Sequence, residues 1–571
     1  MTLMRNLLAT LLILLATATA SAEVTLRIEG IEDELLANVK AWIGPAEETD
    51  RMTFRALEQH ATEKSRLALQ ALGYYDPVIS TERETAGSRI TCLLLINAGE
   101  PVRITRIDIR LSGEGHRELD ELIAASAPRV GNVFHHGAYD SFRDSFLRSA
   151  LMLGYFDARY TQQEVRVDPA SHSAEVTLAL ATGARHRIGD ITIEGEGLNL
   201  ELVSRFPRFR TGDWYNAMQI AELHRDLVRA GWFESVRIIA DPDPVQPLTV
   251  PVVIRYTLRQ RNRVGLGAGF STDVGPRVKV QWEKPRLNRR GHSMGAYAEL
   301  SEVRSQFEAS YVVPLKDPVT SQLAFTYGLQ LEELQDFDFW RTTAGIEHRK
   351  RLANRWRLTR AVQVERETDD FGAREESTTL VVPGITLSRT DSEGALLVTR
   401  GWRATGKIQA ASRDLLSDAE MLRFTLNAKA IHGFGSRTRG ILRGAVGAMA
   451  TPDIQDIPLS LRFFTGGDQS VRGYDYRSIG PVDDQGLVIG GRYNLEGSVE
   501  MDYRFADRWL VALFADSGSA FDKEQSPDFF DGVGAGIRWL SPIGPLRLDF
   551  AYGVSLPDPS FNIHFYMGPE L

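Results

Sequence analysis

The sequence has almost no cysteine. Cys92 is the only one among 571 residues, which excludes an internal disulfide framework and a metal site built from several cysteines. Its neighbours Leu93, Leu94 and Leu95 predict a small buried side chain in a strand. An excess of one charge is also missing, because 66 Lys and Arg stand against 75 Asp and Glu, and both signs are spread along the chain. The net charge of −9 argues against nucleic acid as a partner.

Long apolar runs are missing after residue 22. A membrane helix needs about 20 consecutive apolar residues, and every later apolar run is soon interrupted by a charge, Gly or Pro. The first residues differ, because Arg5 precedes a nearly apolar stretch, 7–18, and the small residues Ala20-Ser21-Ala22 follow. This order predicts a signal peptide over 1–22 and export to an oxidising space. The remainder is too long for one ordinary core and predicts several domains.

The arrangements that enzymes and cofactor sites use are missing as well. Asp516-Ser517-Gly518-Ser519 has the Ser and Asp of a hydrolase, but no His lies nearby to complete a Ser/His/Asp arrangement. His135 and His136 are adjacent and therefore lack the spacing of a helical metal pair. The sequence also contains no phosphate-binding loop. We therefore expect no enzyme, no cofactor and no metal.

What the sequence does contain is a pattern repeated three times in its amino-terminal half. A helical pattern ends in Gly with aromatic residues after it and then leads into an alternating strand, at 72–76, 153–157 and 230–234. The three glycines, Gly73, Gly154 and Gly231, are 81 and 77 residues apart. Each repeat also opens with a short strand that ends in Gly, at 24–30, 107–113 and 191–195, and closes with another strand, most clearly at 174–180.

The repeat predicts a small α/β module in the order strand, helix, helix, strand, strand. The Gly is expected to end the helix in a left-handed turn, which a residue without a β-carbon adopts at little cost. The aromatic side chains then cover the core between helix and sheet. We place three modules at 23–101, 102–183 and 184–260. Such a module has an open sheet edge that can accept an extended client peptide, or it acts only as a rigid spacer.

From about residue 261 the pattern changes to alternating strands and turns. In 493–505 one parity is apolar or Gly and the other is polar, and the same holds for 546–553 and 561–567. Strict alternation of this length puts one face in lipid and the other in water. The inward parity carries charges that need a hydrated lumen or mutual pairing: Glu496, Glu500, Asp502, Arg547 and Asp549.

The length of this domain, 261–571, accommodates about 16 strands at roughly 19 residues per strand and loop. The predicted fold class is therefore multidomain, with three α/β modules followed by a 16-stranded antiparallel transmembrane β-barrel.

Three motifs in this region carry a family resemblance. The segment 466–474, Gly-Gly-Asp-Gln-Ser-Val-Arg-Gly-Tyr, is followed by Ser478-Ile479-Gly480-Pro481. It resembles the loop of the outer-membrane insertase and two-partner secretion superfamily, whose signature is Val-Arg-Gly followed by Tyr or Phe. Phe514-Ala515-Asp516-Ser517-Gly518 is similar to the Asp-x-Gly strand motif of that superfamily, and 534–545 is similar to its next strand. The modules resemble POTRA (polypeptide-transport-associated) domains.

The resemblance implies a function and a location. Three POTRA modules with this barrel length look most like the TamA type, the outer-membrane subunit of the translocation and assembly module. The central insertase BamA typically carries five modules, and the porins of two-partner secretion carry two behind a plug helix. The implied location is the outer membrane with the modules in the periplasm. The implied partners are a TamB-like protein anchored in the inner membrane, client outer-membrane proteins and autotransporters, and the lipid bilayer.

The alternative function is a two-partner-type secretion channel for a dedicated exported protein. A folded-in loop that plugs the lumen argues weakly against a general porin.

The resemblance also implies a set of loop-lock residues. In the superfamily the long loop folds back into the lumen and acidic residues of the barrel wall hold its Arg. Here the loop residues are Arg472, Gly473 and Tyr474, and the acidic residues are Glu500 and Asp516. Removing one partner of such a buried pair costs about 3–5 kcal/mol. The alternative is that Arg472 is an exposed turn residue beside a conformationally required Gly.

A weak seam is predicted where the first and last strands meet. Glycine fills every inward position of the first strand, 264–270, and each costs about 0.5–1 kcal/mol relative to Ala. The last strand ends in Gly568-Pro569, and Pro cannot donate to a ladder. Our hypothesis is that the seam opens laterally and templates a client strand. Alternatively, these glycines only make room inside a crowded lumen. The predicted seam residues are Gly265, Gly267, Gly269, Phe565 and Gly568.

Overall fold

The computed structural model describes most of the chain after residue 22. The described residues are 23–45, 52–86, 89–114, 116–334, 338–370, 375–394, 397–523, 527–541, 544–555 and 560–567. The predicted signal peptide and the predicted seam residue Gly568 lie outside these ranges.

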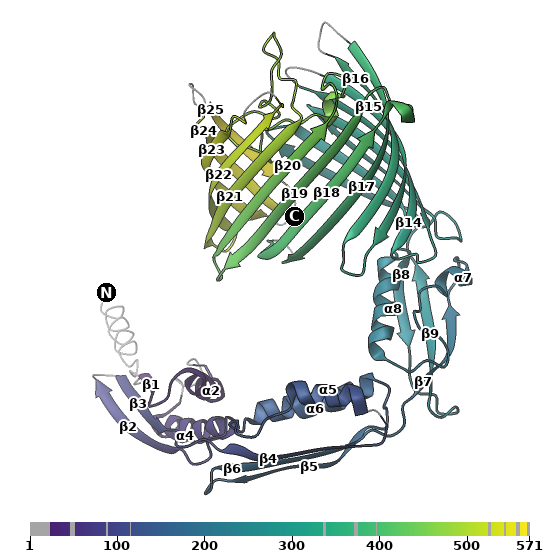
Figure 1. The fold of residues 1–571 in the computed structure, drawn as a ribbon. Helices are drawn as coiled ribbons and strands as arrows, with labels where there is room; N and C mark the ends of the chain where they lie inside the picture. The colour runs from purple at the N-terminus through teal and green to yellow at the C-terminus, as the bar shows by residue number, and fades with distance from the viewer. Residues whose placement is uncertain are drawn as a thin grey trace, which may run out of the picture. The chain divides into compact units, whose positions relative to one another are not determined.

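Three small sheets form the amino-terminal modules (Figure 1). The first module contains β1 (Glu23–Glu29), α2 (Asp33–Ile43), α4 (Phe54–Ala71), β2 (Val78–Ala86) and β3 (Arg89–Asn97). The second contains β4 (Arg103–Ser112), α5 (His116–Ser126), α6 (His136–Met152), β5 (Arg159–Asp168) and β6 (Ser173–Ala181). The third contains β7 (Arg187–Glu194), α7 (Leu200–Val203), α8 (Ala217–Arg229), β8 (Phe233–Ile239) and β9 (Thr249–Leu258).

The predicted order of strand, helix, helix, strand, strand is confirmed in all three modules. The sheets have the orders β1-β3-β2, β4-β6-β5 and β7-β9-β8, so the last strand of each module is the central one. Central strands are apolar on the face toward the helices, as the alternation of β6 shows, where Val176, Leu178 and Leu180 are buried. Cys92 is fully buried with a free thiol in β3, as expected. The module boundaries themselves stay predictions.

The repeated glycines end the helices that precede them. In the first module the amide of Tyr74 donates to the carbonyl of Leu69 at 2.9 Å, and the amide of Gly73 donates to Gln70 at 3.0 Å. This pair of bonds is a Schellman motif, and it requires the left-handed backbone of Gly73, whose φ is 94°. Gly154 repeats the arrangement with a φ of 97°.

The residues around Gly73 also join the first module to the second. The amide of Val102 donates to the carbonyl of Gly73 at 2.8 Å, and the hydroxyl of Tyr75 lies 2.6 Å from Nε2 of His136. Burial lowers the pKa of His136 and raises the pKa of Tyr75, so both groups are neutral near pH 7. The repeated motif therefore does more than cover its own core, because it packs against the next module.

Replacing Gly73 with Ala should open this joint. An added Cβ would lie 2.4 Å from the carbonyl oxygen of Phe134, and the left-handed backbone would be strained as well. Gly131→Ala is the matched control, because Gly131 has a φ of 92° but no atom within 4 Å of an added Cβ. The control should lose about 1–2 kcal/mol from strain alone, and Gly73→Ala about 1–3 kcal/mol more from overpacking. Amide hydrogen exchange in α4 and β4 measures the difference in stability between the two variants. Equal exchange in both would contradict the packing of the first module against the second at Gly73.

The second half of the chain is a closed barrel of 16 strands, in which each strand pairs with its neighbours in sequence (Figure 1). The predicted fold class is confirmed. The strands are β10 (Arg263–Ser271), β11 (Gly275–Lys284), β12 (Ser293–Ser301), β13 (Arg304–Pro314), β14 (Ser321–Glu333), β15 (Asp338–Arg351), β16 (Arg357–Asp370), β17 (Glu375–Glu393), β18 (Arg400–Ala411), β19 (Met421–Phe434), β20 (Thr438–Ala450), β21 (Tyr493–Ala506), β22 (Trp509–Phe521), β23 (Phe530–Ser541), β24 (Gly544–Gly553) and β25 (Ser560–Met567).

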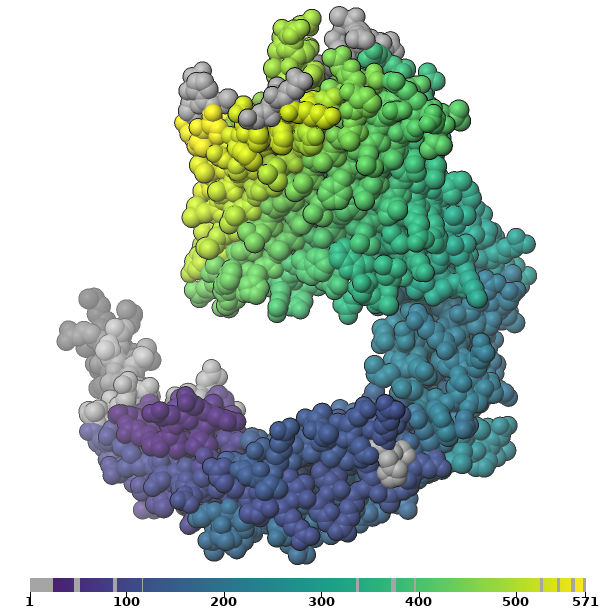
Figure 2. Space-filling model, in the orientation of Figure 1, coloured from purple at the N-terminus to yellow at the C-terminus, as the bar shows by residue number. Residues whose placement is uncertain are grey.

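The two faces of the barrel differ in polarity. Large apolar side chains are exposed on the outer face of successive strands, among them Phe325, Ile346, Val362, Val499 and Leu513. Side chains of neighbouring strands form a continuous wall on the face shown in Figure 2. The charged residues of the opposite parity are buried inside, including Glu500, Asp502 and Asp549. An apolar outer face around a polar interior is the pattern of a barrel that crosses a membrane.

Among the described helices, none is both long enough and apolar enough to span a bilayer.

Candidate functional site

The longest connection of the described barrel folds into the lumen. We call residues 451–492, between β20 and β21, the inner loop. It contains one short 3-10 helix, η2 (Leu459–Leu461), and its residues Val471, Tyr474 and Ile479 are buried together. Its side chains and amides contact inward residues on two opposite stretches of wall, β14–β16 and β21–β25.

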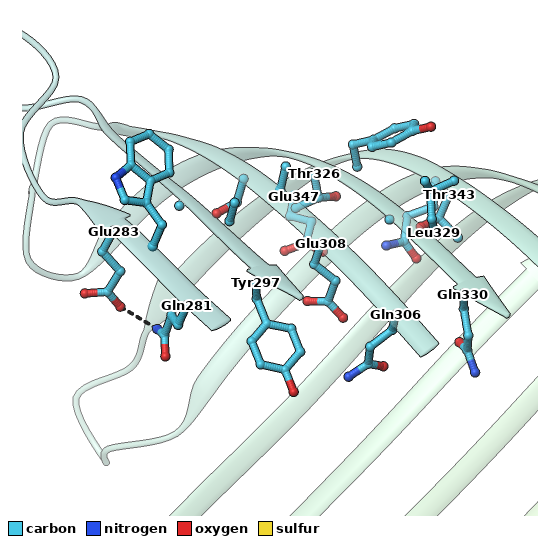
Figure 3. Close-up of a pocket in the computed structure, with 18 of the residues that line it drawn as sticks. Gln281, Glu283, Tyr297, Gln306, Glu308, Thr326, Leu329, Gln330, Thr343 and Glu347 are labelled. Atoms are coloured by element: carbon cyan, nitrogen blue, oxygen red, sulfur yellow. Dashed lines mark hydrogen bonds between the residues drawn. The ribbon is translucent and has the colours of Figure 1, made fainter. Parts of the chain in front are cut away.

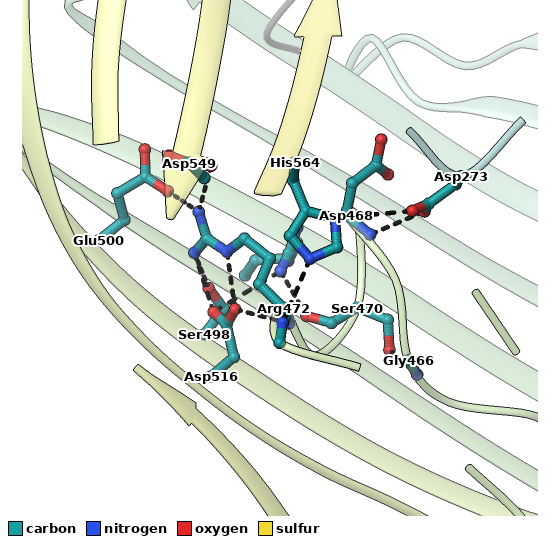
Figure 4. A network of polar contacts seen from close by, with 12 residues as sticks. Asp273, Gly466, Asp468, Ser470, Arg472, Ser498, Glu500, Asp516, Asp549 and His564 are labelled. Carbon is teal, nitrogen blue, oxygen red and sulfur yellow. Dashed lines mark hydrogen bonds and ion pairs between the residues drawn. The ribbon is translucent and has the colours of Figure 1, made fainter. Parts of the chain in front are cut away.

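Arg472 lies at the centre of a buried ion network (Figure 4). The residue is only 3% exposed. Nε and Nη2 donate to the two carboxylate oxygens of Asp516 at 2.7 and 2.9 Å, and Nη1 donates to Glu500 at 2.8 Å. The guanidinium carbon stands 3.4 Å from the centre of the Phe514 ring. A planar guanidinium with a two-pronged carboxylate contact and an aromatic face below it is a geometry that Lys cannot reproduce.

The structure thus brings Arg472 together with both predicted acidic residues, and it adds others that the sequence analysis missed. Asp549 accepts a further bond from Nη1 of Arg472 at 3.1 Å, and Arg538 donates to Glu500 at 2.9 Å. Arg443 lies 3.8 Å from Asp516. Strand parity already placed Asp549 inside the barrel, but parity says nothing about which loop residue it meets.

A row of glycines on β23 makes room for this network. Gly532, Gly534 and Gly536 all lie on the inward parity of the strand. A Cβ on Gly532 would stand 2.0 Å from the carbonyl oxygen of Arg472, and one on Gly536 would stand 1.9 Å from a carboxylate oxygen of Asp549. The loop itself approaches Gly532, whereas Gly534 and Gly536 of the predicted strand motif leave room for barrel side chains of the network, Phe514 and Asp549.

The two loop-lock residues after Arg472 fasten the loop to the end of the barrel chain. Gly473 has a φ of 98°, and its amide donates to Nε2 of His564 in β25 at 3.2 Å. The Tyr474 hydroxyl donates to the carbonyl of Asp531 at 3.2 Å, and its ring packs edge-on against Phe530. All five predicted loop-lock residues therefore lie in one contact network.

The start of the inner loop is bound to the opposite wall. The amide of Ser460 donates to Glu367 at 2.8 Å and that of Leu459 to Asp369 at 3.3 Å, both on β16. Arg341 on β15 donates to the Ser460 hydroxyl at 3.0 Å. The sequence does not predict this second attachment, because the backbone amides of η2 carry no side-chain signal.

Beside this attachment the lumen wall is hollow and polar (Figure 3). A cavity of about 430 Å³ is lined by β11–β16. Its lining includes Gln281, Tyr297, Gln306, Glu308 and Gln330. Amide, hydroxyl and carboxylate groups of this density favour water over an apolar ligand, so this part of the lumen is hydrated.

The seam between β10 and β25 is short. β10 pairs with β11 over its whole length, from Arg263 with Glu283 to Ser271 with Gly275. On its other side the paired residues are Ser271 and Tyr566, beside a bond from the Thr272 amide to the carbonyl of Phe565 at 3.3 Å.

This register carries most of β10 beyond the described part of β25. In an antiparallel pair each step back along one strand matches a step forward along the other, so Phe270 faces Met567. Residues 263–269 then face positions after 567, outside the described part of the chain. Among the described residues, β25 therefore offers 263–269 no backbone partner. Val264 and Leu266 on this stretch are 66% and 80% exposed on the outer face.

The predicted seam residues occupy this region in part. Gly265, Gly267 and Gly269 lie in β10 on the inward parity, and β-carbons on the first two would meet only Cβ atoms of β11, at 3.8 and 3.6 Å. The Phe565 ring lies 5.8 Å from that of Phe270 across the seam.

Comparison with known proteins identifies the domains. Residues 287–570 match the model of the Omp85 superfamily domain, and residues 25–98 match that of POTRA domain TamA domain 1. The outer membrane protein assembly factor BamA of Nitratidesulfovibrio vulgaris is 24% identical over 414 residues, which cover 68% of this chain and 51% of that protein. BamA of Neisseria meningitidis serogroup B is 22% identical over 473 residues, 69% of this chain and 58% of that protein. The chain thus spans little more than half the length of these relatives.

A solved structure supports the fold. BamA from Haemophilus ducreyi lacking POTRA domains 1-3 superposes with a TM-score of 0.66 at 15% identity, covering 81% of this chain and 99% of that one. Together with the apolar outer wall, these matches indicate an outer-membrane barrel. The chain therefore carries an Omp85 superfamily domain as its membrane barrel, preceded by α/β modules of which the first is a POTRA domain.

Proposed function

We propose that this protein is an outer-membrane assembly factor that inserts or translocates β-barrel proteins, autotransporters among them, through the seam between β10 and β25. The observation that carries the proposal is the short seam between β10 and the described part of β25. Among the described residues the two strands pair at Ser271 and Tyr566, whereas β10 pairs with β11 over its full length on the other side. The relatives named as outer membrane protein assembly factors support the same role.

The physical reason is the cost of bare amides in lipid. Each unsatisfied backbone group costs several kcal/mol in hydrocarbon, so a client strand needs a paired edge as it enters. When the seam parts, the edge of β10 offers donors and acceptors in the outer wall, where the exposed Val264 and Leu266 side chains match the lipid. A client strand that pairs there has partners along one of its two edges as it enters. Arg472 has a structural role in this scheme, since it holds the inner loop in place.

We infer further that the protein acts in the TamA manner, with a TamB-like partner anchored in the inner membrane. The match of residues 25–98 to POTRA domain TamA domain 1 supports this, as do the three modules. The modules stand in the periplasm, where the edge strands β1 and β2 are available to an extended segment of the partner or of a client.

The test is insertion of a radiolabelled autotransporter barrel into liposomes that contain the full chain. Heat-modifiable migration and protease protection report insertion, and empty liposomes give the background rate. We expect the protein to accelerate insertion above that background. No acceleration, either alone or with a TamB-like partner added, would refute the proposal and favour a secretion channel for a dedicated exported protein.

A further inference from the structure

The inner loop touches both sides of the seam, and these contacts go beyond the network around Arg472. On the β10 side the Ser271 hydroxyl donates to a carboxylate oxygen of Asp468 at 2.8 Å. The amide of Asp468 in turn donates to Asp273 at 2.7 Å, directly after β10. A Cβ on Gly467 would stand 2.6 Å from the same carboxylate, so the loop backbone lies against this end of the strand.

On the β25 side the loop is held by three successive inward residues of the strand. The Gly473 amide donates to His564 at 3.2 Å, and the Ser560 hydroxyl donates to the Gly473 carbonyl. Asn562 donates to the carboxylate of Asp475 at 3.1 Å. Figure 4 shows His564 and Asp273 on either side of the loop.

The two sides also meet directly, at the backbone pair of Ser271 with Tyr566 and through Arg277 of β11, which donates to the Met567 carbonyl at 3.0 Å. The direct contacts of the His564 side chain are weaker than the contacts through the loop. Nδ1 of His564 lies 3.7 Å from Asp273 and 3.4 Å from the Thr272 hydroxyl, both long for hydrogen bonds. The contacts that run through 468–475 include distances of 2.7 and 2.8 Å to carboxylate oxygens. Both are ordinary hydrogen-bond lengths, shorter than either direct contact of the His564 side chain.

We propose that residues 468–475 are a clasp that holds the seam shut, and that the barrel opens when Asp468 leaves Ser271 and Asp273. Arg472 lies in the middle of the clasp and anchors it to β22, so loop position and seam closure are one coupled state. The purpose of the clasp rests on the proposed function, because it would keep the β10 edge closed until a client strand competes for it. The existence of the clasp does not rest on the proposed function, since opening of the seam can be measured without any client.

The experiment measures the seam directly in lipid nanodiscs. In a Cys92→Ser background, spin labels are attached at Leu266→Cys and Ile563→Cys, two outward positions that lie outside the clasp. Electron spin resonance then gives the distribution of distances across the seam. Asp468→Ala and Ser271→Ala remove the same hydrogen bond from opposite ends. Asp484→Ala is the matched control, because Asp484 is exposed in the same loop and outside the clasp.

We expect the ratio of open to closed seams to rise about tenfold in both clasp variants, equivalent to about 1.4 kcal/mol, and to stay unchanged in Asp484→Ala. An unchanged distribution in Asp468→Ala and Ser271→Ala, with folding verified by heat-modifiable migration, would overturn the clasp. Should Asp468→Ala fail to fold, Ser271→Ala still decides, because it removes one hydroxyl only. The nanodisc measurement contains no client. If the seam opens in the clasp variants but the protein does not insert clients in the liposome assay, the proposed function is refuted and the clasp still stands.

Discussion

Replacing Arg472 with Ala is expected to destabilise the barrel more than loss of any exposed Arg. The change leaves Glu500, Asp516 and Asp549 buried without the guanidinium that now contacts all three. Breaking a buried ion pair by removing one partner costs about 3–5 kcal/mol. The midpoint of heat-modifiable migration in detergent should therefore fall clearly. Arg437→Ala is the matched control, because Arg437 is exposed in the turn between β19 and β20.

Two further variants separate charge from geometry. Arg472→Lys keeps the charge but loses the two-pronged contact with Asp516. The midpoint of its heat-modifiable migration should therefore lie between those of Arg472→Ala and the original protein. Adding Asp516→Asn to Arg472→Ala should recover part of the lost stability, because one uncompensated buried carboxylate becomes neutral. If Arg472→Ala unfolds at the same temperature as Arg437→Ala, the loop-lock role of Arg472 is wrong.

A disulfide across the seam should abolish client insertion reversibly. The pair to link is Ser271→Cys with Tyr566→Cys in a Cys92→Ser background, because these two residues face each other in the register. Residues 264–269 of β10 are unsuitable, since this register carries them past the described end of β25. The oxidised protein should insert an autotransporter barrel at least about tenfold more slowly, as each ~1.4 kcal/mol added to a barrier slows a step tenfold.

Two controls test whether the effect comes from locking the seam. Reduction of the disulfide should restore insertion, because it removes only the covalent link. A second double variant, Leu442→Cys with Val499→Cys, joins two facing, lipid-exposed residues of β20 and β21 away from the seam. It should insert clients at the original rate whether oxidised or reduced. Undiminished insertion by the oxidised seam variant would exclude lateral opening at β10 and β25.

Much of the fold could be read from local patterns. The alternation in 493–505 correctly assigned Val499 to the outer face and Glu500 to the lumen, because neighbouring side chains of a strand point to opposite faces whatever the rest of the fold does. The helix ends at Gly73 and Gly154 were equally predictable, since the left-handed turn is a property of the glycine and its own helix.

The residues of the site were predictable only where they belong to a recognisable sequence motif or were implied by the family resemblance. Arg472, Glu500 and Asp516 were expected together from a resemblance, and the structure places them in contact. Arg538 carried no signal of its own beyond inward parity. The bonds from Ser460 and Leu459 to β16 were invisible, because backbone amides are the same in every residue except proline.

The sequence by itself determined which face each strand residue occupies, where the module helices end, and that the chain forms a barrel behind three α/β modules. These properties depend on residues a few positions apart. The tertiary structure alone decided that Asp549 joins Arg472, that β25 overlaps β10 at little more than Ser271 and Tyr566, and that Asp468 bridges toward β10. All three are contacts between distant parts of the chain, 77 residues apart for Arg472 and Asp549 and 197 for Ser271 and Asp468. They depend on how the loop folds into the barrel and on the register at which the barrel closes, and no local pattern encodes either.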